Sequence, residues 1–539
     1  MRKKTEGAGE LIRVWNDWSA GIGYSTADEN RPGMYNAIGI LGGRGELRPA
    51  MHKYSMNISA ATSASNLVMG YYFDVQTSGG GNVSNTLGSY GYPVMRDITT
   101  VFNGNVLKLD YRNATFGTLI QENDADSAYG QPAFYAGDWH IGSDPQGIGT
   151  SPIIRRLSTV GTSGGGDTWS EGDVDSGGTR DLLIPTGNQL VRCTRFGRIR
   201  MSVPGEDVLQ EANWGSSFLP TADVTNEFSY IKALFSLDNS LFMLSTDGLL
   251  SFNKSGRIGV VNNDYNRFAS TFSYIFTAAW RGGVVYPDRG GLRYYRVGNE
   301  PIYIGPESRL RSGGNIVPAA VTELSFGIYH GVASVGDYLF TIYQPVSGVA
   351  TAYLMVGYFN DLTNDIAWQV INDLSLKSPT GDQFYVYPHG VGVSTVSRPE
   401  STTRYSPIVL FTDEEPGTTH LSYMILDPTG SPFRSGGNTH RITTSGDAWL
   451  SEEFWPDTKD PSHLVVYTDN MVSGDEWQLS FVNDSGADIN CGAPIIGNGR
   501  HVRELGLRSV QTSILHINWA STSTASRIAP RIRRIELWG

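Results

Sequence analysis

Residues 228–261 read FSYIKALFSLDNSLFMLSTDGLLSFNKSGRIGVV, and this stretch decides the fold that we expect. Four short apolar runs are separated by the turn sequences LDNS, TDG and NKSG. Asn and Gly tolerate a positive φ, and Asp and Ser bond their own backbone, so each separator lets the chain reverse. The stretch predicts a four-stranded antiparallel meander, with strands at Tyr230–Phe235, Leu241–Ser245, Leu249–Phe252 and Ile258–Val261.

The same pattern of apolar run, turn and second apolar run recurs between about residue 65 and residue 427. A four-stranded sheet is too small to bury both faces alone, so such sheets stack radially as a propeller or face to face as a sandwich. Hairpins of a Greek-key sandwich can also recur at irregular intervals. We favour a degenerate β-propeller of six or seven blades, with units at 99–111, 182–194, 233–245, 278–287, 333–343 and 406–426.

Two further parts flank this region. Residues 1–58 are Gly-rich and lack a helical apolar period, so they predict an extended N-terminal arm that packs on its own domain or reaches a neighbouring subunit. The propeller-like domain spans residues 59–436, with long Gly- and Asp-rich loop insertions at 120–150 and 161–180, where binding is expected. Residues 437–539 predict a C-terminal β-sandwich.

The apolar runs of this C-terminal part alternate with polar residues. The last run predicts a closing strand with a bulge at Arg533 and Arg534. We expect this strand to pair with the first strand of the chain, around Leu11–Trp15. Further strands are expected around Leu464–Tyr467 and Gln478–Val482.

Composition limits the classes of protein that the chain can belong to. An apolar content of 40% over 539 residues supports a folded protein, and the formal charge of −12 argues against an outer surface that wraps nucleic acid. Cys193 and Cys491 match no metal-ligand or redox spacing, so both are expected to be buried small hydrophobic residues. The N-terminal segment lacks the apolar run of a signal peptide, and no apolar stretch is long enough to predict a membrane span.

Both ends of the chain resemble a known family. WLSEEF, LVVYT, EWQLSFVNDSG and APRIRRIELWG resemble, in this order, the C-terminal module of tailed-bacteriophage virion proteins of the propeller type. WSAGIG followed by NAIGILGGRGELRPAM is similar to the N-terminal arms of phage tail, neck and nozzle proteins, which end in a Gly-x-Leu-Arg-Pro phrase, here Gly45, Leu47, Arg48 and Pro49. The chain is shorter than the podophage nozzle pattern, which leaves its position at the neck, along the tail or at its tip open. The resemblance implies a structural component of the tail or neck in a symmetric oligomer.

No residue pattern predicts a catalytic site. TSGGGDTW, residues 162–169, invites comparison with the sialidase Asp-box, but Gly164 stands at the Asp position and Thr162 at the Ser position. An Arg triad cannot be assigned, and no G-x-S-x-G lies between a strand and a helix. Trp139 and Trp169 are candidates for stacking against a glycan.

Two acidic segments are candidates for a metal site. Asp173, Asp175 and Asp181 lie in DVDSGGTRD, where a Gly-rich loop could wrap Ca²⁺, but the EF-hand spacing is not met, and a solvated acidic loop is the favoured interpretation. GDWHIGSD, residues 137–144, sets His140 between two carboxylates. A loop His that bonds a neighbouring carbonyl is commoner than a ligand. We therefore expect no cofactor, with Ca²⁺ as a minor alternative.

Basic clusters stand out in this acidic chain. Arg192, Arg195, Arg198 and Arg200 lie in VRCTRFGRIR and are candidates for lining a channel that DNA crosses, where weak phosphate contacts suffice. The favoured alternative is pairing with acids across a domain or subunit interface. A second cluster near the C-terminus comprises Arg527, Arg531, Arg533 and Arg534.

The sequence thus predicts an all-β virion protein of a tailed phage that is not an enzyme. We expect it to form a symmetric homo-oligomeric ring in the tail, neck or nozzle, to be assembled in the host cytoplasm, to contact other virion proteins and to line the DNA passage. The alternative is a glycan-binding or glycan-cleaving propeller protein that acts in host receptor recognition. An enzyme of that kind would need two carboxylates about 5 to 10 Å apart.

Overall fold

The computed structural model consists almost entirely of β-structure. Among the residues that it describes there is no α-helix, and the 3₁₀ helix η2 spans Glu211–Asn213. The described residues are 10–22, 34–55, 57–58, 441–450, 453–483, 488–505 and 507–539, the strands given below, and residues 136–137, 172–173, 187–188, 202–216, 277, 281–282, 296–301, 304–306, 336–337, 426–427 and 429–433. The expectation of an all-β fold is confirmed for this part of the chain.

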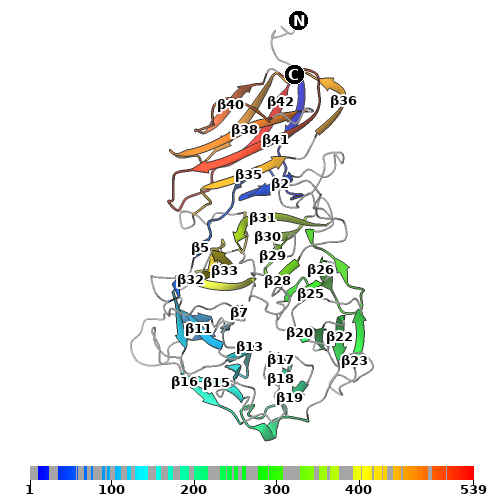
Figure 1. Cartoon of the computed structure of the whole chain (residues 1–539), viewed down its shortest axis with the longest axis vertical. Coiled ribbons are helices and arrows are strands. Elements are labelled where there is room, and N and C mark those ends of the chain that lie inside the picture. Colours follow the sequence, from blue (N-terminus) through cyan, green and yellow to red (C-terminus); the bar gives the residue numbers. More distant parts are fainter. Residues whose placement is uncertain are drawn as a thin grey trace.

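The lower part of the molecule in Figure 1 consists of small sheets set around a common centre. Most of their neighbouring strands are consecutive in the chain and antiparallel, as short turns require. The first of these sheets holds β6 (Asn57–Ile58), β7 (Asn66–Val68), β8 (Asp74–Gln76), β9 (Gly88–Gly91), β10 (Val94–Arg96), β11 (Gly104–Asp110) and β12 (Thr118–Glu122). The second holds β13 (Ala128–Tyr135), β14 (Asp138–Ser143), β15 (Ile153–Thr159), β16 (Thr168–Glu171), β17 (Leu182–Thr186), β18 (Gln189–Cys193) and β19 (Ile199–Met201).

Three four-stranded sheets complete this series. They are β20 (Ile231–Leu237), β21 (Ser240–Ser245), β22 (Gly248–Phe252) and β23 (Ile258–Asn262); β24 (Ala278–Trp280), β25 (Gly283–Asp288), β26 (Gly291–Tyr295) and β27 (Ile302–Tyr303); and β32 (Val393–Ser401), β33 (Arg404–Glu415) and β34 (Thr418–Ile425) with β5 (Tyr54–Ser55) from the N-terminal arm. The strand β5 pairs antiparallel with β34, through Tyr54 and Tyr423, whose rings stack with centroids 5.0 Å apart. The last sheet of the series is thus completed by a strand from the start of the chain.

The meander predicted for residues 228–261 is confirmed. Its strands β20, β21, β22 and β23 pair in chain order, and each pair is antiparallel. Strand alternation sends Leu234 to one face, where it packs in a cluster with Val191 of β18. It sends Phe235 to the other face, in a cluster with Val284 of β25. Both faces of this small sheet are therefore buried against its neighbours in the series, which is how a sheet too small to be stable alone is stabilised.

A ten-stranded sheet joins the lower and upper parts of the molecule. Its lower half is β28 (Ile328–Val335), β29 (Tyr338–Gln344), β30 (Thr351–Asn360) and β31 (Asp365–Ser375). Its upper half is β35 (Ser445–Leu450), β36 (Glu453–Lys459), β38 (Asp475–Asn483), β39 (Asp488–Asn490) and β41 (Val510–Ser521). The arm strand β2 (Met34–Ile38) lies between β31 and β35 and pairs with both. The boundary predicted at residue 436 is therefore bridged by backbone pairing, and the domain limits stay predictions.

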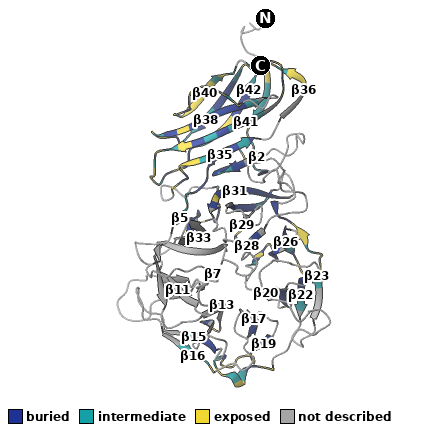
Figure 2. Cartoon of the chain, viewed as in Figure 1, coloured by how far each residue is buried: buried dark blue, intermediate teal, exposed yellow. Residues whose placement is uncertain are grey.

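A second upper sheet is built from both ends of the chain. It combines β1 (Leu11–Trp15), β3 (Ile40–Gly43) and β4 (Glu46–Pro49) with β37 (His463–Asp469), β40 (Gly499–Glu504) and β42 (Arg531–Trp538). The predicted pairing of first and last strands is confirmed, since β1 runs antiparallel to β42. The predicted bulge is confirmed at Arg533, because Tyr467 faces Arg534 and Thr468 faces Ile532. Figure 2 shows buried residues along the strands where the upper sheets meet.

The arm packs on its own chain wherever it is described. Trp18 is fully buried, and the backbone N–H of Ile22 donates to the carbonyl of Trp368 over 2.8 Å. Gly21 has φ of +79°, and a Cβ there would lie 2.4 Å from the Trp368 carbonyl oxygen, so the close approach requires glycine. The described part of the arm thus packs on its own chain, and whether the arm also reaches a neighbouring subunit stays a prediction.

Both predicted loops contain strands. The insertion at 161–180 includes β16, which pairs antiparallel with β15. The insertion at 120–150 contains a β-hairpin formed by β13 and β14, with the turn at Ala136 and Gly137, whose φ values are 53° and 92°. Two consecutive positive φ values are typical of the tight hairpin turn that suits strand twist. Ala at the first turn position is not a recognised turn signal, which is why the sequence pattern indicated a loop.

Candidate functional site

The strongest candidate site is the joint, by which we mean the contact of the arm strands β1, β3 and β4 with the C-terminal strands β37 and β42. Leu47 lies opposite Ile532, and both side chains are fully buried. Glu46 accepts a hydrogen bond from Arg531 over 3.2 Å, which links the β4 hairpin to the closing strand by charge as well as by packing. The joint holds together segments that are almost 500 positions apart in the sequence.

Asp469 is the central carboxylate of the joint. It accepts hydrogen bonds from Nε of Arg531 at 2.8 Å and from Nε of Arg533 at 2.7 Å. Burial by itself raises the pKa of Asp469, but the hydrogen bonds and charges of the two arginines lower it more, and the result lies below its ordinary value. The pKa of Arg531 is raised, mainly by its hydrogen bond to Asp469. Both groups are therefore charged at neutral pH and pair within the fold.

The Gly-x-Leu-Arg-Pro phrase has a structural role at each position. Gly45 has φ of +73° in the turn between β3 and β4. Leu47 fills the core of the joint, and Pro49 ends β4 opposite Ile40. Arg48 is buried and donates from Nη2 to the carbonyl of Pro432 at 2.6 Å, which ties the hairpin to a loop of the lower part. Burial lowers the pKa of Arg48 to about 10, so it is still charged at pH 7.

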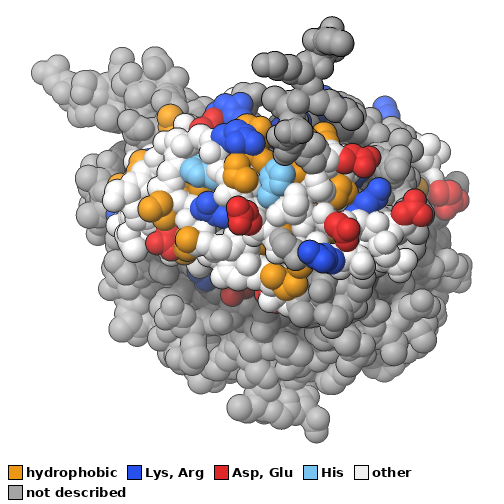
Figure 3. Space-filling view, turned by 90° about the horizontal axis from the view of Figure 1, so that it is seen from above, with side chains coloured by type: hydrophobic (Ala, Val, Ile, Leu, Met, Phe, Trp, Pro, Cys, Tyr) orange, Lys and Arg blue, Asp and Glu red, His pale blue; other side chains and the backbone are white. Residues whose placement is uncertain are grey.

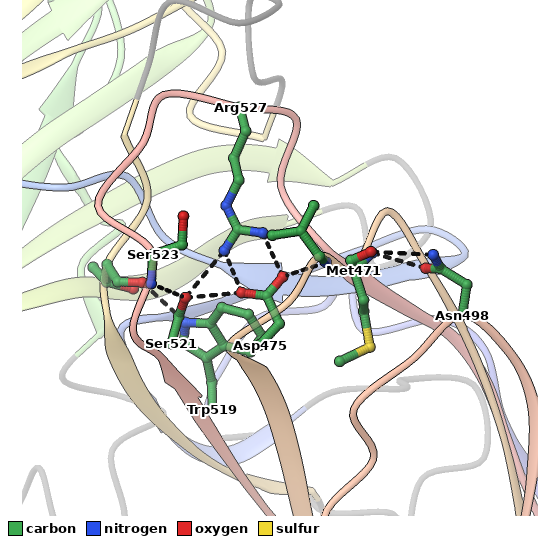
Figure 4. Close-up of polar contacts among 9 residues, drawn as sticks. Met471, Asp475, Asn498, Trp519, Ser521, Ser523 and Arg527 are labelled. Atoms are coloured by element: carbon green, nitrogen blue, oxygen red, sulfur yellow. Dashed lines mark hydrogen bonds and ion pairs between the residues drawn. The ribbon is translucent and has the colours of Figure 1, made fainter.

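A buried polar cluster lies at one end of the upper sheets (Figure 4). Asp475 is fully buried and forms two hydrogen bonds with the guanidinium of Arg527. It also accepts from the backbone N–H of Val472 at 2.9 Å and from the hydroxyl of Ser521 at 2.8 Å. Asn498 exchanges two hydrogen bonds with the backbone of Met471, at 2.8 and 3.1 Å. These contacts fix three loops against one another, residues 470–474, 495–499 and 522–530, which we call the loop tip.

The view from above shows no concentration of one side-chain type. Hydrophobic, basic, acidic and histidine side chains are interspersed over the described part of this face (Figure 3). Interspersed charge of both signs is typical of a solvated surface or of the rim of a protein contact, and not of a site that collects a polyanion.

The predicted DNA-channel residues are wrong for the two arginines that the structure describes. Arg192 is 1% exposed, stacks over the ring of Trp214 at 3.9 Å and donates to Glu211 at 2.6 Å. Arg200 is 8% exposed and pairs with the other oxygen of Glu211. Their guanidinium groups thus hold the η2 segment against β18 and β19. Arg195 and Arg198 lie outside the described residues.

The C-terminal arginines also pair with acids, but the pairs given below lie within the C-terminal part and not across the domain or subunit interface that the favoured alternative specified. Arg531 and Arg533 share Asp469, and Arg534 donates to Glu536 at 2.7 Å. The pairing occurs within the chain. Sequence alone did not show the pairing of Arg531 and Arg533, because Asp469 lies on β37, which becomes a neighbour of β42 only in the folded protein.

The candidate glycan residues lie in one sheet. Trp139 is on β14 and Trp169 on β16, the two strands that flank β15. Their side chains lie outside the described residues. His140, beside Trp139, is 2% exposed, and its Nδ1 lies 3.1 Å from the carbonyl oxygen of Asp138. Burial lowers the pKa of His140 to about 4, so the ring is neutral and donates to that carbonyl, as the favoured interpretation held.

The metal candidates are only partly described. Asp173 accepts a hydrogen bond from the backbone N–H of Glu211 at 3.0 Å, so its carboxylate supports the start of η2. Asp144, Asp175 and Asp181 lie outside the described residues. Within the part of the chain that the structure describes, no group of three or more His, Cys, Asp or Glu residues is placed to hold a metal ion.

The two cysteines are as expected. Cys193 and Cys491 are both buried and free. Burial raises the pKa of Cys491 to about 12, so its thiol is protonated and unreactive at neutral pH. In the described residues, no helix is long and apolar enough to cross a membrane.

One constellation escaped the sequence analysis. His516 on β41 pairs through Nε2 with Asp447, and its Nδ1 lies 3.3 Å from the hydroxyl of Ser480. The three residues are distant in sequence and match no spacing motif. The set resembles a Ser-His-acid triad, but Ser480 is 8% exposed and its strand is paired on both sides, opposite β39 and β41. The strand that carries Ser480 is hydrogen-bonded to a neighbouring strand on each side, so no pair of backbone N–H groups at Ser480 is left to stabilise an oxyanion. The cluster is therefore structural.

Comparisons with known proteins add little. No family model and no curated protein matches the chain. Among solved structures it is similar to an exo-β-1,3-galactanase from Phanerochaete chrysosporium, at 9% identity over 90% of this chain and 100% of that chain, with a TM-score of 0.26. It is also similar to a Trypanosoma rangeli sialidase mutant that displays trans-sialidase activity, at 9% identity over 91% and 94% of the chains, with a TM-score of 0.30. A computationally designed protein, Ika8, is 12% identical over 69% of this chain and all of its own, with a TM-score of 0.33. Similarities this low carry no conclusion about activity.

Proposed function

We propose that the protein is a structural component of a tailed-bacteriophage virion that assembles into a symmetric ring in the tail, neck or nozzle. Its role is mechanical and does not require catalysis. The observation that carries the proposal is the joint. The two segments that resemble phage virion proteins, the Gly-x-Leu-Arg-Pro phrase and the closing strand, meet in one sheet through Leu47 and Ile532.

The joint strengthens the resemblance for a physical reason. If the two matching segments lay far apart in space, each weak sequence match would have to be judged by itself. Here Glu46 pairs with Arg531 and Arg48 reaches the lower part, so the matching positions belong to one packed unit. The resemblance therefore concerns a single structural module that fixes the upper part of the molecule to the lower part.

The lower part is proposed to be a seven-bladed propeller. Its units in chain order are β6–β12, β13–β16, β17–β19, β20–β23, β24–β27, β28–β31, and β32–β34 with β5. The pairing of β5 with β34 closes the circle by joining the start of the chain to the last unit. A closed circle protects the edges of short sheets and gives a rigid disc, which suits a protein that has to bear load in a particle.

The test is the solution mass of the purified chain by light scattering, at several concentrations. A closed ring predicts discrete multiples of 58.8 kDa, and negative-stain images of the assembled fraction are expected to show closed rings of one copy number. A chain that stays monomeric at every concentration, and gains thermal stability from an oligosaccharide, would contradict the proposal and favour the glycan-binding alternative.

A further inference from the structure

A very short segment of the arm joins the last sheet of the lower part to the first. The strand β5 pairs with β34 of the last sheet through Tyr54 with Tyr423 and Ser55 with Ser422. Directly after it, β6 pairs in parallel with β12 of the first sheet. A strand this short forms few backbone hydrogen bonds, and segments with few contacts are the first to open locally. The attachment of β5 therefore depends on the side chains around it.

Three aromatic rings hold β5 against β34. The ring of Tyr54 stacks on that of Tyr423, with centroids 5.0 Å apart and an angle of 17° between the planes. The ring of His52 meets Tyr54 edge to face, at 5.0 Å and 85°. Stacked and edge-to-face arrangements are the attractive geometries for ring pairs. His52 thus takes part in the attachment of β5, although it precedes the strand.

The chain is firmly anchored up to the residue before His52. Ala50 and Met51 are buried in a core that they share with β31 and β33. The carbonyl of Ala50 accepts a hydrogen bond from the backbone N–H of Thr443 at 2.9 Å. The backbone N–H of His52 donates to the carbonyl of Arg441 over 3.1 Å, and its side chain is only partly buried. A local release of β5 can therefore begin at His52 and leave the preceding arm in place.

Among the described residues, the charged groups that act on the His52 ring are both cations. Arg441 lies on the segment that leads into β35, and Lys53 is the next residue in the chain. The ammonium group of Lys53 lies 3.5 Å from the backbone carbonyl oxygen of Asp373 on β31. Burial, and then the charges of Arg441 and Lys53, lower the pKa of His52 below its ordinary value. A proton on His52 would add a third positive charge to this group.

We propose that residues 52–55 are an acid-released strap, which holds β5 on β34 while His52 is neutral and releases it when His52 takes up a proton. This inference goes beyond the proposed function and does not depend on the ring. Release uncovers the edge of β34, whose backbone groups are then free to pair with another strand. The strands β2 and β4 keep their own partners, β35 and β42, so the rest of the arm stays attached.

The direction of the pH effect follows from the lowered pKa. In the released segment His52 titrates near its ordinary pKa of about 6.5, whereas in the attached segment the ring resists protonation. The attachment is therefore fully stable above this pH and weakens as the pH falls below it, until the attached ring is itself protonated. Between about pH 7.5 and about pH 5.5, the ratio of attached to released segment can fall by about tenfold at most.

The test is hydrogen exchange of the full chain, measured by mass spectrometry at these two pH values and divided by the intrinsic exchange rate at each. Peptides that cover β5 and β34 are expected to lose about three- to tenfold of their protection in acid in the natural chain. In His52→Gln, whose side chain stays neutral, they are expected to keep it. Arg441→Gln, at an exposed residue, is expected to show a smaller loss than the natural chain, because one of the two like charges is absent.

The matched control is His463→Gln, which removes a histidine from β37 in the upper part and is expected to keep the acid response of the natural chain. Peptides of β38 report global unfolding and are expected to stay protected at both pH values. An equal loss at β5 in the natural chain and in His52→Gln, or no loss in either, would overturn the strap. A loss that β38 shares would show global unfolding and also overturn it. Circular dichroism checks that each variant folds.

Discussion

At the scale of single residues, buried charge is the feature that most constrains this protein. Asp475 has no exposed surface and depends on Arg527, Ser521 and the backbone of Val472 for its hydrogen bonds. A buried ion pair adds little net stability compared with an apolar pair, but removing one partner leaves a charge that neither water nor protein compensates.

Arg527→Ala is therefore expected to lower the free energy of unfolding by about 3 to 5 kcal/mol. Adding Asp475→Asn in the same chain is expected to recover part of the loss, because a neutral amide is less costly to bury unpaired than a carboxylate. Chemical denaturation of the three proteins measures both effects. A loss below about 1 kcal/mol in the single variant would mean that the pair is solvated.

His516 predicts a pH dependence of stability. Burial alone would lower the pKa of His516, but the hydrogen bond and charge of Asp447, with a smaller contribution from Asp488, raise it above its ordinary value. The stacked ring of Trp449, at 3.9 Å, and the hydroxyl of Ser480 are its other neighbours. Because the folded pKa is the higher one, the charged ring stabilises the fold at pH values below the unfolded pKa, and this contribution is lost as the pH rises through the folded pKa.

The expected result is that stability falls more steeply in the natural chain than in His516→Gln as the pH rises above about 6.5, the ordinary pKa of His. The comparison with the variant is essential, because His140 has a lowered pKa. Below its unfolded pKa, His140 makes stability rise with pH, which is opposite to the effect of His516. Denaturation at a series of pH values tests this. Equal slopes for the two proteins would show that His516 is not held by its carboxylates.

At the scale of elements, the arm acts as a set of strands and not as a tail. The strand β1 pairs only with β42 among the described strands, and it places Trp15, 6% exposed, in the main core. Leu11 at the other end of the same strand is 41% exposed. The stability contributed by β1 thus comes from its buried end.

Trp15→Ala is expected to lower the free energy of unfolding by about 3 to 5 kcal/mol, as for other large core side chains. Leu11→Ala on the same strand is the matched control and is expected to cost well under half as much, because its side chain keeps much of its solvent contact. Denaturant unfolding compares the two variants. Similar losses would mean that backbone pairing, and not the buried indole, holds the arm.

At the scale of the whole molecule, three arm segments connect what the chain order separates. The strand β2 lies between β31 and β35, β4 reaches β42, and β5 completes the sheet of β34. Upper and lower parts are therefore expected to move as one body, which the proposed ring would require if load is to pass from copy to copy. Light scattering tests the proposed ring at this scale, because it detects contacts that no single chain can make.

Sequence by itself determined the local features of this protein. The meander at 228–261, the strands β37 and β38 and the bulge at Arg533 follow from turn residues and alternation, which act over a few positions. The burial of Cys193 and Cys491 followed from the lack of any metal-ligand or redox spacing between them. The pairing of β1 with β42 was also predicted, because the apolar runs at the two ends of the chain were each expected to form a strand that pairs with another strand.

Only the tertiary structure decided which distant groups meet. It paired Arg192 with Glu211 and Asp475 with Arg527, turned the predicted loop at 120–150 into a hairpin, and set β2 between two halves of one sheet. The physical reason is that the residues next to a charged side chain or a strand edge in the sequence do not indicate which distant group will pair with it. That partner is selected by the packing of the complete chain, where burial makes an unpaired charge or an unpaired backbone group too costly to keep.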